Sequence, residues 1–460
     1  MADAITDHEQ TIVALSTPNG LGALALIRLS GGRAIEIADI IFHGKKLSIA
    51  ETHTAHFGTI LQDEKKIDEV VVTIFKNPSS YTGEDVVEIS CHGSSYIQQQ
   101  IINLIIAHGA RLAKPGEFTL RAFLHGKLDL SQAEAVADLI ASETESAHHI
   151  AMNQMRGGYS DELKNLRFEL IHFASLLELE LDFSEEDVEF ADRKLLLHLV
   201  EKIKSVLQRL IKSFELGNVM KNGVATVIAG RPNAGKSTLL NALLNQERAI
   251  VSEIPGTTRD TIEEELIIHG ITFRLIDTAG LREASDEIEK RGVERTMKKI
   301  QESAMLIYVF DMHTLSKEEL EKDLAQFKKG NYKFILVANK MDKGVFIEHL
   351  ESLDKFYHVQ IISSLEKTNI EALKQAMYEI IAGEDKLSTQ TIVSNVRHLQ
   401  ALIKTKEVIE NVMQSVENKE SGEFTALHLR HALNYLGEIT GEVTNEHLLD
   451  DIFRNFCIGK

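Results

Sequence analysis

The segment VATVIAGRPNAGKSTLLNALLN, residues 224–245, decides the fold of the central part of this 460-residue chain. It begins with an apolar run typical of a buried strand and ends with the apolar spacing of a helix. Between them, Gly230–Ser237 satisfies the pattern G-x-x-x-x-G-K-[ST], in which backbone amides and a helix N-terminus bind phosphate. The pattern predicts that Lys236 reaches the β- and γ-phosphates and that Ser237 places its hydroxyl on Mg²⁺. Taken alone, the motif also allows a glycine loop without a ligand.

Further motifs follow in order, each beside an expected strand. Asp277–Gly280 (DTAG) follows the strand-like FRLI, and its aspartate is expected to hold the hydration shell of Mg²⁺. Asn339–Asp342 (NKMD) follows KFILVA, and its aspartate can accept from the ring N–H and the exocyclic amine of guanine. Thr258, in the loop GTTRD, is the expected second Mg²⁺ hydroxyl. The order of the motifs predicts a GTP-hydrolysing domain. The predicted GTP-binding residues are Asn233, Ala234, Gly235, Lys236, Ser237, Thr238, Ser252, Glu253, Ile254, Pro255, Gly256, Thr257, Thr258, Asp277, Thr278, Ala279, Gly280, Asn339, Lys340, Asp342, Ser363 and Ser364.

Two residues depart from the pattern of Ras-like proteins. Leu281 stands where those proteins carry the glutamine that positions the attacking water, so catalysis must come from elsewhere. Asn233 lies inside the phosphate loop, and its carbonyl together with oxygens of the segment 252–258 could hold a monovalent cation beside the phosphates. Such a cation would act electrostatically like an arginine finger. The alternative is that Asn233 only stabilises a turn.

The pattern of apolar residues predicts several domains. Short β-rich runs alternate with polar helical segments between about 218 and 384, which predicts a doubly wound, mostly parallel sheet. Helical spacing dominates on both sides of it, and Ser131 is the expected N-cap of a capping box with Glu134. The expected strands are 11–15, 23–30 and 69–75 in the first part, and 223–230, 273–280, 304–311, 333–340 and 359–364 in the sheet. The expected segments are 1–118, an N-terminal α/β domain; 119–217, a first helical half; 218–384, the inserted P-loop GTPase domain; and 385–460, a second helical half.

Composition narrows the classes of function. With 50 basic and 69 acidic residues the net charge is −19, which argues against a protein that coats nucleic acid through a broad basic field. Two cysteines, Cys91 and Cys457, are too few for a secreted disulfide framework. The first residues do not form a signal peptide, and no apolar run is long enough to span a bilayer. We therefore expect a cytoplasmic protein that does not associate with membranes.

Several longer strings resemble one family. GRPNAGKS, GTTRD, DTAGLREASDEIE and NKMD match it in the central domain, and RLSG, YTGEDVVEISCHG and KPGEFTLRAFLHGKLDL match it in the first part. The chain ends in Cys457-Ile458-Gly459-Lys460, which matches the closing signature of the family. The chain thus resembles the tRNA-modification GTPase MnmE (TrmE) family along essentially its whole length. The resemblance implies a multidomain α/β plus all-α fold, with a folate-binding-type N-terminal domain, a discontinuous helical domain and an inserted Ras-like GTPase domain.

The resemblance also implies an activity and partners. Members are K⁺-stimulated GTPases that dimerise through their N-terminal domains and work with the FAD-dependent partner MnmG (GidA). Together they add an aminomethyl or carboxymethylaminomethyl group to C5 of the wobble uridine of certain tRNAs. The carbon comes from a tetrahydrofolate derivative, the 5-formyl or 5,10-methylene form. The implied residues are Asn233, Ser252, Ile254 and Thr257 for K⁺; Ser237 and Thr258 for Mg²⁺; Glu289, Arg282 and Lys236 for catalysis; and Arg28, Glu88, Lys127 and Lys460 for folate.

A second function stays open at this stage. The chain could be a regulatory GTPase that only gates assembly of a partner such as a ribosome particle. The N-terminal strings and the terminal tetrapeptide favour modification, because a pure switch would not need them. Cys457 could act as a nucleophile only as its thiolate. The acidic net charge predicts that tRNA binds through local patches or mainly through the partner complex.

Overall fold

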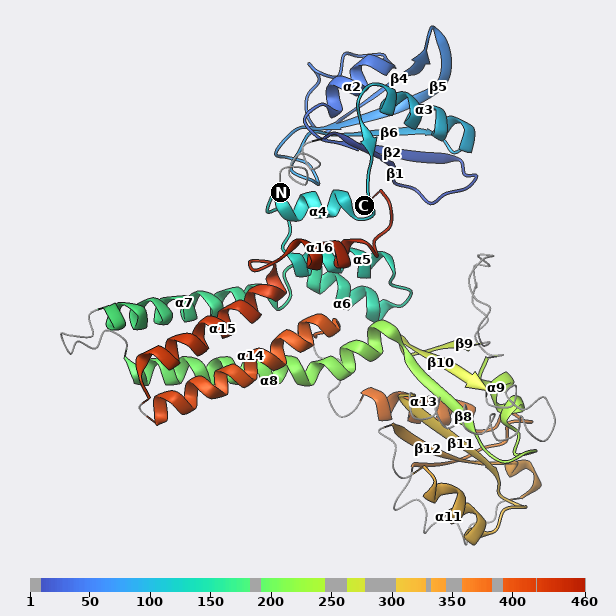
Figure 1. Cartoon of the computed structure of the whole chain (residues 1–460). Helices are drawn as coiled ribbons and strands as arrows, with labels where there is room; N and C mark the ends of the chain where they lie inside the picture. Colours follow the sequence, from blue (N-terminus) through green and yellow to red (C-terminus); the bar gives the residue numbers. More distant parts are fainter. Residues whose placement is uncertain are drawn as a thin grey trace, which may run out of the picture. The chain divides into compact units, whose positions relative to one another are not determined.

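The computed structural model describes residues 10–182, 192–244, 263–277, 303–327, 332–344, 358–382, 392–418 and 420–459 (Figure 1). The chain divides into two compact units. The first comprises Met1–Ala141, Ala151–Leu207 and Gln400–Lys460, and the second Ser142–Ile150 and Gln208–Leu399. The expected fold class is confirmed, with an N-terminal α/β domain, helices from separated stretches and an inserted α/β domain. The domain boundaries expected from the sequence remain predictions. Helix α4, Glu117–Leu124, runs across the expected boundary after residue 118, and helix α8, Arg193–Asn222, runs across the one after residue 217.

The N-terminal domain is built on a seven-stranded sheet of order β3-β4-β5-β6-β2-β1-β7. Neighbouring strands are antiparallel except β1 and β7, which run parallel. Alternate residues of β5, among them Val70, Val72 and Ile74, are buried against helices α2 and α3. The bounds are β1 Ile12–Leu15, β2 Leu24–Ser30, α2 Ala34–Ile41, β3 Phe42–His43, β4 Thr54–Gln62, β5 Lys65–Phe75, β6 Val86–His92, α3 Ser95–Ala107 and β7 Arg111–Leu112.

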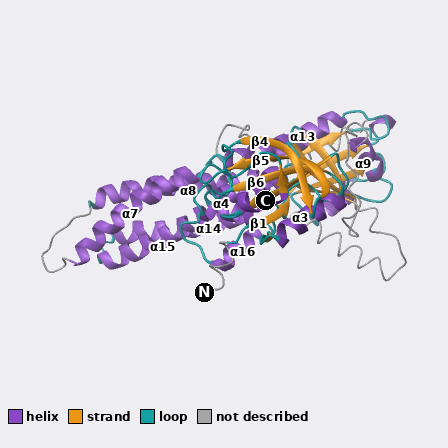
Figure 2. Ribbon diagram, turned by 90° about the horizontal axis from the view of Figure 1, so that it is seen from above, coloured by secondary structure: helices purple, strands orange, loops and turns teal. Residues whose placement is uncertain are grey.

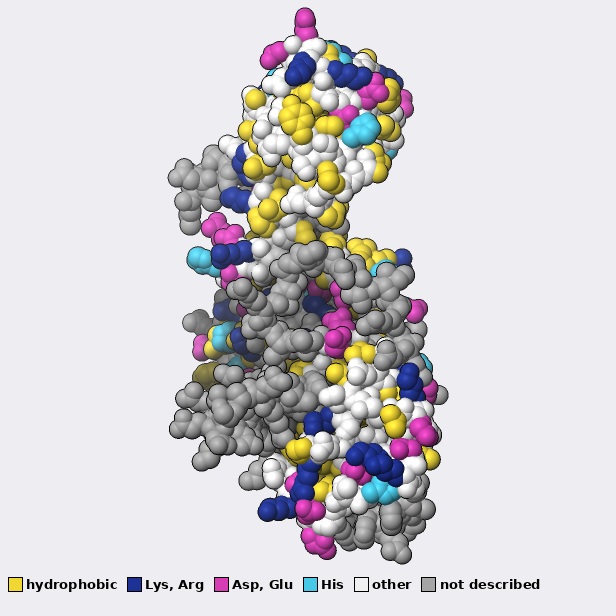
Figure 3. Space-filling model, turned by 90° about the vertical axis from the view of Figure 1, so that its right-hand side faces the viewer, with side chains coloured by type: hydrophobic (Ala, Val, Ile, Leu, Met, Phe, Trp, Pro, Cys, Tyr) yellow, Lys and Arg dark blue, Asp and Glu magenta, His cyan; other side chains and the backbone are white. Residues whose placement is uncertain are grey.

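The face of this sheet opposite α2 and α3 is partly apolar and exposed. Phe57 on β4 is 69% exposed, and its register partner Val71 on β5 is 41% exposed. Leu24 on β2 is 66% exposed. Figure 3 shows hydrophobic side chains among the exposed ones of this domain. Arg28 and Glu88, which are paired in register on β2 and β6, alternate with core residues and so lie on this same face.

A buried cluster of charges joins this sheet to α4, Glu117–Leu124. Arg121 is 1% exposed and donates to Glu84 at 2.9 Å, to Glu117 at 3.0 Å and to the carbonyl oxygen of Gln10 at 2.7 Å. Glu117 also accepts from Arg111 at 2.7 Å. Burial would raise the pKa of Glu117, but these arginines and the amide of Lys114 hold its pKa below the ordinary value. Each buried charge therefore has an opposite partner, which a buried ion requires.

Four long helices of the helical part run side by side in Figures 1 and 2. Ion pairs cross between neighbouring helices, from Lys202 to Glu169 at 3.0 Å and from Lys204 to Glu410 at 3.1 Å. Leucines at helical spacing are buried between them. These helices are α7 Ser160–Asp182, α8 Arg193–Asn222, α14 Val396–Glu417 and α15 Gly422–Thr440; the shorter ones are α5 Leu130–Ile140, α6 Glu145–Met155 and α16 Glu446–Phe453.

The expected N-cap at Ser131 is wrong. Helix α5 begins at Leu130 and its N-cap is Asp129, whose carboxylate accepts from the amide of Gln132. The side chain of Gln132 accepts in turn from the amide of Asp129, which completes a capping box two residues earlier than expected. Ser131 instead donates its hydroxyl to Asp129. Aspartate and serine are both favoured N-caps, and the helix begins directly after Asp129, which leaves Ser131 inside its first turn.

The inserted domain has a six-stranded sheet of order β13-β12-β11-β8-β10-β9. All neighbours are parallel except β9 and β10, which are antiparallel. Helices α9 and α13 pack on one face and α11 on the other. The sequence did not predict β9, which begins with three glutamates and forms the sheet edge. The bounds are β8 Val224–Ala229, α9 Lys236–Leu244, β9 Glu263–Ile268, β10 Ile271–Asp277, β11 Met305–Asp311, α11 Lys317–Ala325, β12 Lys333–Asn339, β13 His358–Ile361 and α13 Ile370–Ala382.

The buried cluster predicts an acid-sensitive N-terminal domain. Because the folded-state pKa of Glu117 lies below its ordinary value of 4.5, its contribution is present above pH 4.5 and is lost as the pH falls through the folded-state value. Glu117→Gln is expected to lower the free energy of unfolding at pH 7 by about 1–3 kcal/mol. The variant should also show a smaller fall in the free energy of unfolding between pH 6 and pH 3.

Urea unfolding followed by circular dichroism measures the free energy of unfolding and its dependence on pH, with the exposed Glu51→Gln as control. An unchanged pH slope in Glu117→Gln would contradict the assignment.

Candidate functional site

The phosphate loop lies between β8 and α9, and close backbone approaches require two of its glycines. Gly230 has φ +151°, and a Cβ atom there would lie 2.0 Å from the carbonyl oxygen of Val309. Gly235 has φ +97°, and a Cβ atom there would lie 2.3 Å from Nδ2 of Asn339. Atoms that are not bonded to each other do not approach this closely, so any other residue at either position would displace the loop. The loop is thus packed tightly against two neighbouring strands.

Lys236 is buried inside the curve of this loop. It is the first residue of α9, and its Nζ donates to the carbonyl oxygens of Gly230 at 3.1 Å and Arg231 at 3.0 Å. A buried ammonium requires such acceptors. The ammonium therefore lies where the loop backbone and the N-terminus of α9 converge, which is the position of phosphate in loops of this pattern.

Asn339 connects the phosphate loop with the opposite side of the site. Its Nδ2 donates to the carbonyl oxygen of Ala234 at 2.8 Å, and its Oδ1 accepts from the amide of Ser364 at 3.0 Å. Asn339 is 2% exposed, so both ends of a buried amide are used. Three segments that the sequence predicted separately are thus joined through one side chain.

Asp342 faces the same loop as Asn339. Its Oδ1 accepts from the hydroxyl of Ser363 at 2.6 Å. This hydrogen bond holds the pKa of Asp342 below its ordinary value, so the carboxylate is charged at neutral pH. An exposed, oriented carboxylate can accept from two N–H donors on one edge of a base. The arrangement suits guanine, which presents two donors on one edge, and disfavours adenine.

Arg231, which the sequence pattern leaves unspecified, ties the phosphate loop to α11. Its Nε donates to Asp323 at 2.7 Å and its guanidinium donates to Glu319 at 2.8 Å. The hydroxyl of buried Tyr308 donates to the same Asp323 at 2.6 Å. The sequence carried no signal for this cluster, because the acidic partners follow 88 and 92 positions later.

The rest of the predicted nucleotide site is described only in part. Ser237 and Thr238 are exposed on the first turn of α9, and Asn233 is exposed with φ +61°. Asp277 is the last residue of β10, level with Ile228 of β8, and only its backbone is described. Outside the described residues lie Ser252, Glu253, Ile254, Pro255, Gly256, Thr257, Thr258, Thr278, Ala279, Gly280, Leu281, Arg282 and Glu289.

A second candidate site lies on the outer face of the N-terminal sheet. Arg28 donates to Glu88 from Nε at 2.9 Å and from a terminal nitrogen at 2.7 Å. The guanidinium lies 5.6 Å from the ring centroid of Tyr81 and 5.8 Å from that of Phe118. The hydroxyl of Tyr81 is hydrogen-bonded to Thr119 at 2.9 Å. The structure therefore brings a charge pair and two aromatic rings together at this point.

Lys127 and the C-terminal tail approach the same region. Lys127 Nζ donates to the carbonyl oxygen of Pro78 at 2.9 Å, in the segment that leads to Tyr81. The carbonyl oxygen of Gly459 accepts from Ser16 at 3.1 Å and lies 3.5 Å from a terminal nitrogen of Arg28. Two of the predicted folate residues are thus paired with each other and a third lies nearby, whereas Lys460 lies outside the described residues.

The two cysteines differ in environment. Cys457 is exposed in the tail, whereas Cys91 is buried on β6. Burial, with the nearby charge of Asp68, raises the pKa of Cys91 to about 11. Cys91 is therefore a protonated thiol at neutral pH and a packing residue.

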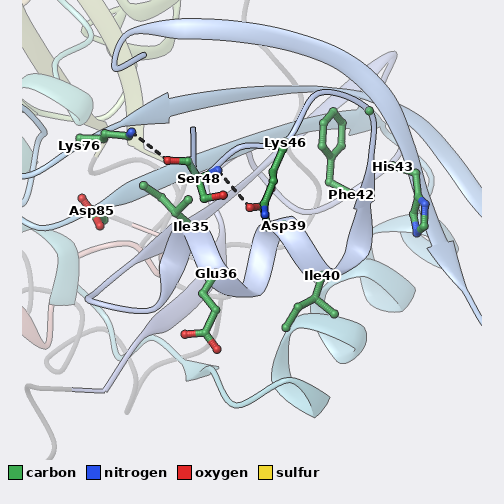
Figure 4. A pocket seen from close by; sticks show the side chains of 11 residues that line it. Ile35, Glu36, Asp39, Ile40, Phe42, His43, Lys46, Ser48, Lys76 and Asp85 are labelled. Atoms are coloured by element: carbon green, nitrogen blue, oxygen red, sulfur yellow. Dashed lines mark hydrogen bonds between the residues drawn. The ribbon is translucent and has the colours of Figure 1, made fainter. Parts of the chain in front are cut away.

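A pocket of about 880 Å³ lies beside α2 in the N-terminal domain (Figure 4). Its charged side chains mostly hold the loop that follows β3. Asp39 accepts from the amide of Ser48 at 3.0 Å, Lys76 donates to the carbonyl oxygen of Ser48 at 3.2 Å, and Glu36 is paired with Arg33. These side chains thus serve to order the loop and carry no sign of a ligand.

Among the residues that the structure describes, no group of three or more His, Cys, Asp or Glu side chains is placed to hold a metal ion. No helix in the described ranges is long and apolar enough to cross a membrane.

Comparisons with known proteins cover nearly the whole chain. A family model described as the MnmE helical domain matches residues 130–457, and a model of the GTP-binding protein TrmE N-terminus matches residues 11–127. The chain is 53% identical over 458 residues to the tRNA modification GTPase MnmE of Cytophaga hutchinsonii, which covers 99% of each protein. It is 51% identical over 460 residues to the protein of the same name from Flavobacterium psychrophilum, covering 98% of this chain and 100% of the relative.

Among solved structures, the FeoB G-domain from Methanococcus jannaschii aligns with the chain at 25% identity and a TM-score of 0.27. The alignment covers 35% of this chain and 98% of the FeoB domain.

Proposed function

Because the chain belongs to the MnmE family of tRNA modification GTPases, we propose that it binds GTP between its phosphate loop and its NKMD motif and uses hydrolysis to support modification of the tRNA wobble uridine. The observation that carries this proposal is the buried side chain of Asn339. It donates to Ala234 of the phosphate loop and accepts from Ser364 on the opposite side. A phosphate-binding loop and a base-reading loop are thereby held at one fixed separation, as a nucleotide requires.

Each described residue has a defined role in this proposal. Lys236 exchanges its two carbonyl acceptors for oxygens of the β- and γ-phosphates. Asp342 accepts from the two guanine donors, and Ser363 keeps its carboxylate oriented. The amide of Ser364 stays bonded to Asn339, so the base loop does not need to reorganise on binding.

Two cations complete the proposed site. Ser237, exposed on the first turn of α9, and Thr258 would hold Mg²⁺. Asn233 and oxygens of Ser252, Ile254 and Thr257 would hold K⁺, which supplies positive charge beside the phosphates. The side chain of Asn233 is exposed, so its oxygen is accessible to a cation beside the phosphate loop. Its φ of +61° also fits the alternative role of forming a turn, because asparagine tolerates this conformation.

Water activation is assigned to residues after DTAG. Leu281 has no group that can orient water. We assign that role to Glu289, acting indirectly, with Arg282 as a second candidate in the same segment. Both assignments rest on the resemblance of DTAGLREASDEIE to the family pattern.

We place a tetrahydrofolate derivative, in its 5-formyl or 5,10-methylene form, at the site around Arg28. Arg28 is paired with Glu88, so the two side chains together offer both hydrogen-bond donors and acceptors. This combination suits the pterin ring, whose edge carries donors and acceptors, better than it suits a carboxylate of the folate tail. The ring of Tyr81, 5.6 Å from Arg28, offers a flat face for stacking. Lys127 and Lys460 are left for the carboxylates of the folate tail.

We propose a homodimer that forms through the outer face of the N-terminal sheet. Phe57, Val71 and Leu24 are exposed there, while the helices of the domain cover the other face. A second copy of the same face would bury these side chains. The face is continuous with Arg28 and Glu88, so the proposed interface lies beside the folate site.

We propose that tRNA is held largely by the complex with the FAD-dependent partner MnmG. Basic residues of the helical bundle are neutralised locally, as in the pairs of Lys202 with Glu169 and Arg430 with Glu178. On the face seen in Figure 3, basic and acidic side chains are interspersed. Such a surface gives little non-specific attraction to phosphate. A cytoplasmic location remains our prediction.

The cation proposal predicts that GTP hydrolysis is faster in K⁺ than in Na⁺ by about tenfold or more. Asn233→Gly should remove this difference, because it deletes the side-chain oxygen and keeps the positive φ accessible. Steady-state phosphate release in the two salts measures the ratio of the hydrolysis rates. The matched control is Asn241→Ala, which changes an exposed asparagine on α9. If Asn233→Gly keeps the K⁺ effect and Asn233→Ala loses activity in both salts, Asn233 is a turn residue instead.

The folate proposal predicts that Arg28→Ala weakens binding of 5-formyltetrahydrofolate by roughly tenfold or more, because it removes a charged partner of Glu88. GTP hydrolysis should be retained. Equilibrium dialysis measures the loss of folate affinity, with the exposed Arg33→Ala as control.

In cells that carry only Arg28→Ala, nucleoside analysis should find unmodified wobble uridine. Normal folate affinity in the variant would contradict the site, and unchanged wobble uridines in cells lacking the whole protein would contradict the function.

The dimer proposal predicts that Phe57→Glu converts the protein to a monomer, since two carboxylates would be buried against an apolar face. Sedimentation equilibrium gives the mass directly. Phe168→Glu is the matched control, because Phe168 is a 75% exposed phenylalanine on α7. Phe57→Glu that remains dimeric would exclude this face as the interface.

A further inference from the structure

Asp311 is a buried acid beside the nucleotide site that the GTPase motifs do not include. It is the last residue of β11 and is 8% exposed. In the parallel pairing of β11 with β12 it lies level with Asn339, the first residue of the NKMD motif. An aspartate at this position must have partners, because a buried carboxylate without them is strongly unfavourable.

A closed ring of hydrogen bonds supplies these partners. Lys340 donates from Nζ to Oδ2 of Asp311 at 2.7 Å. The backbone amide of His313 donates to Oδ1 of Asp311 at 3.0 Å, and the ring Nε2 of His313 donates to the carbonyl oxygen of Lys340 at 3.1 Å. Both the side chain and the backbone of Lys340 are therefore held by the segment that follows β11.

The backbone of Lys340 shows why such support is needed. Its φ is +69°, a left-handed conformation that is unfavourable for residues with a side chain and persists where surrounding contacts impose it. This conformation turns the chain between Asn339 and Asp342, so that the two can bond to Ser364 and Ser363 respectively.

The protonation state of Asp311 is consistent with this role. Burial would raise the pKa of its carboxyl, but the hydrogen bonds from Lys340 and from the amide of His313 hold the pKa below its ordinary value. The carboxylate is charged at neutral pH and forms a full ion pair with Lys340.

We propose that Asp311 is a positioning residue for guanine-nucleotide binding, which acts by fixing the ammonium group and side-chain direction of Lys340. The inference rests on the proposed nucleotide site. A lysine side chain that is already fixed loses less conformational entropy when a nucleotide binds beside it, so the bound state is favoured. Asp311 does not contact the reacting phosphate, so it affects affinity and leaves the chemical step unchanged.

Asp311→Asn is the decisive variant, because an asparagine oxygen can still accept from the amide of His313 while the charge is removed. Titration of full-length protein with fluorescent GDP and GTP analogues is expected to show a roughly tenfold loss of affinity for both. The kcat at saturating GTP and the preference for guanosine over xanthosine nucleotides should not change. Glu321→Gln, on the exposed side of α11, is the matched control and should bind normally.

A double-mutant cycle shows whether Asp311 acts through Lys340. Lys340→Met should weaken binding, and adding Asp311→Asn to it should cause no further loss. Additive losses, or an Asp311→Asn protein with normal affinity, would overturn the inference.

Asp342→Asn in the same titrations tests the nucleotide site itself and should shift the preference toward xanthosine nucleotides. If Asp342→Asn leaves GTP affinity unaffected, the nucleotide site is wrongly assigned; if it shifts the preference and Asp311→Asn has no effect, only the role of Asp311 fails.

Discussion

The nucleotide site depends on one buried amide. Asn339, at the end of β12, donates to the phosphate loop and accepts from the loop after β13. Because the side chain is 2% exposed, neither hydrogen bond is weakened by competing water. Removing it would leave a buried carbonyl and a buried amide without partners. The spacing between the phosphate and base positions therefore follows from the parallel strands β8, β11, β12 and β13, because this amide links the loops at their ends.

Contacts around this amide stiffen each side of the site separately. Arg231 fastens the start of the phosphate loop to α11 through Asp323 and Glu319. Asp311 fastens Lys340 on the base side. All three acids belong to β11 or α11, so one strand and the helix that follows it support both sides of the proposed nucleotide site. Rigid support of this kind reduces the ordering that binding must impose.

The N-terminal domain uses buried charge differently. Arg121 is almost fully buried and connects Glu84, Glu117 and the carbonyl oxygen of Gln10, which are far apart in the sequence. Such a network fixes the loop that carries Tyr81, and so holds the aromatic ring beside Arg28. The candidate folate site is thus supported by largely buried ion pairs. The C-terminal tail adds a second support, since Gly459 accepts from Ser16 and approaches Arg28.

The sequence by itself determined the parts that depend on local patterns. The strand, glycine loop and helix around Gly230–Ser237, the five parallel strands of the inserted sheet and the fold class could all be predicted from spacing and residue type. It failed at β9, an edge strand that begins with glutamates, and at the cap of α5, where Asp129 competes with Ser131. Only the tertiary structure decided which charges meet. Arg231 and Asp323 are 92 residues apart, and Asn339 and Ala234 are 105 residues apart. No local pattern encodes such pairs, because folding brings together strand ends, loops and helices that lie far apart in the sequence.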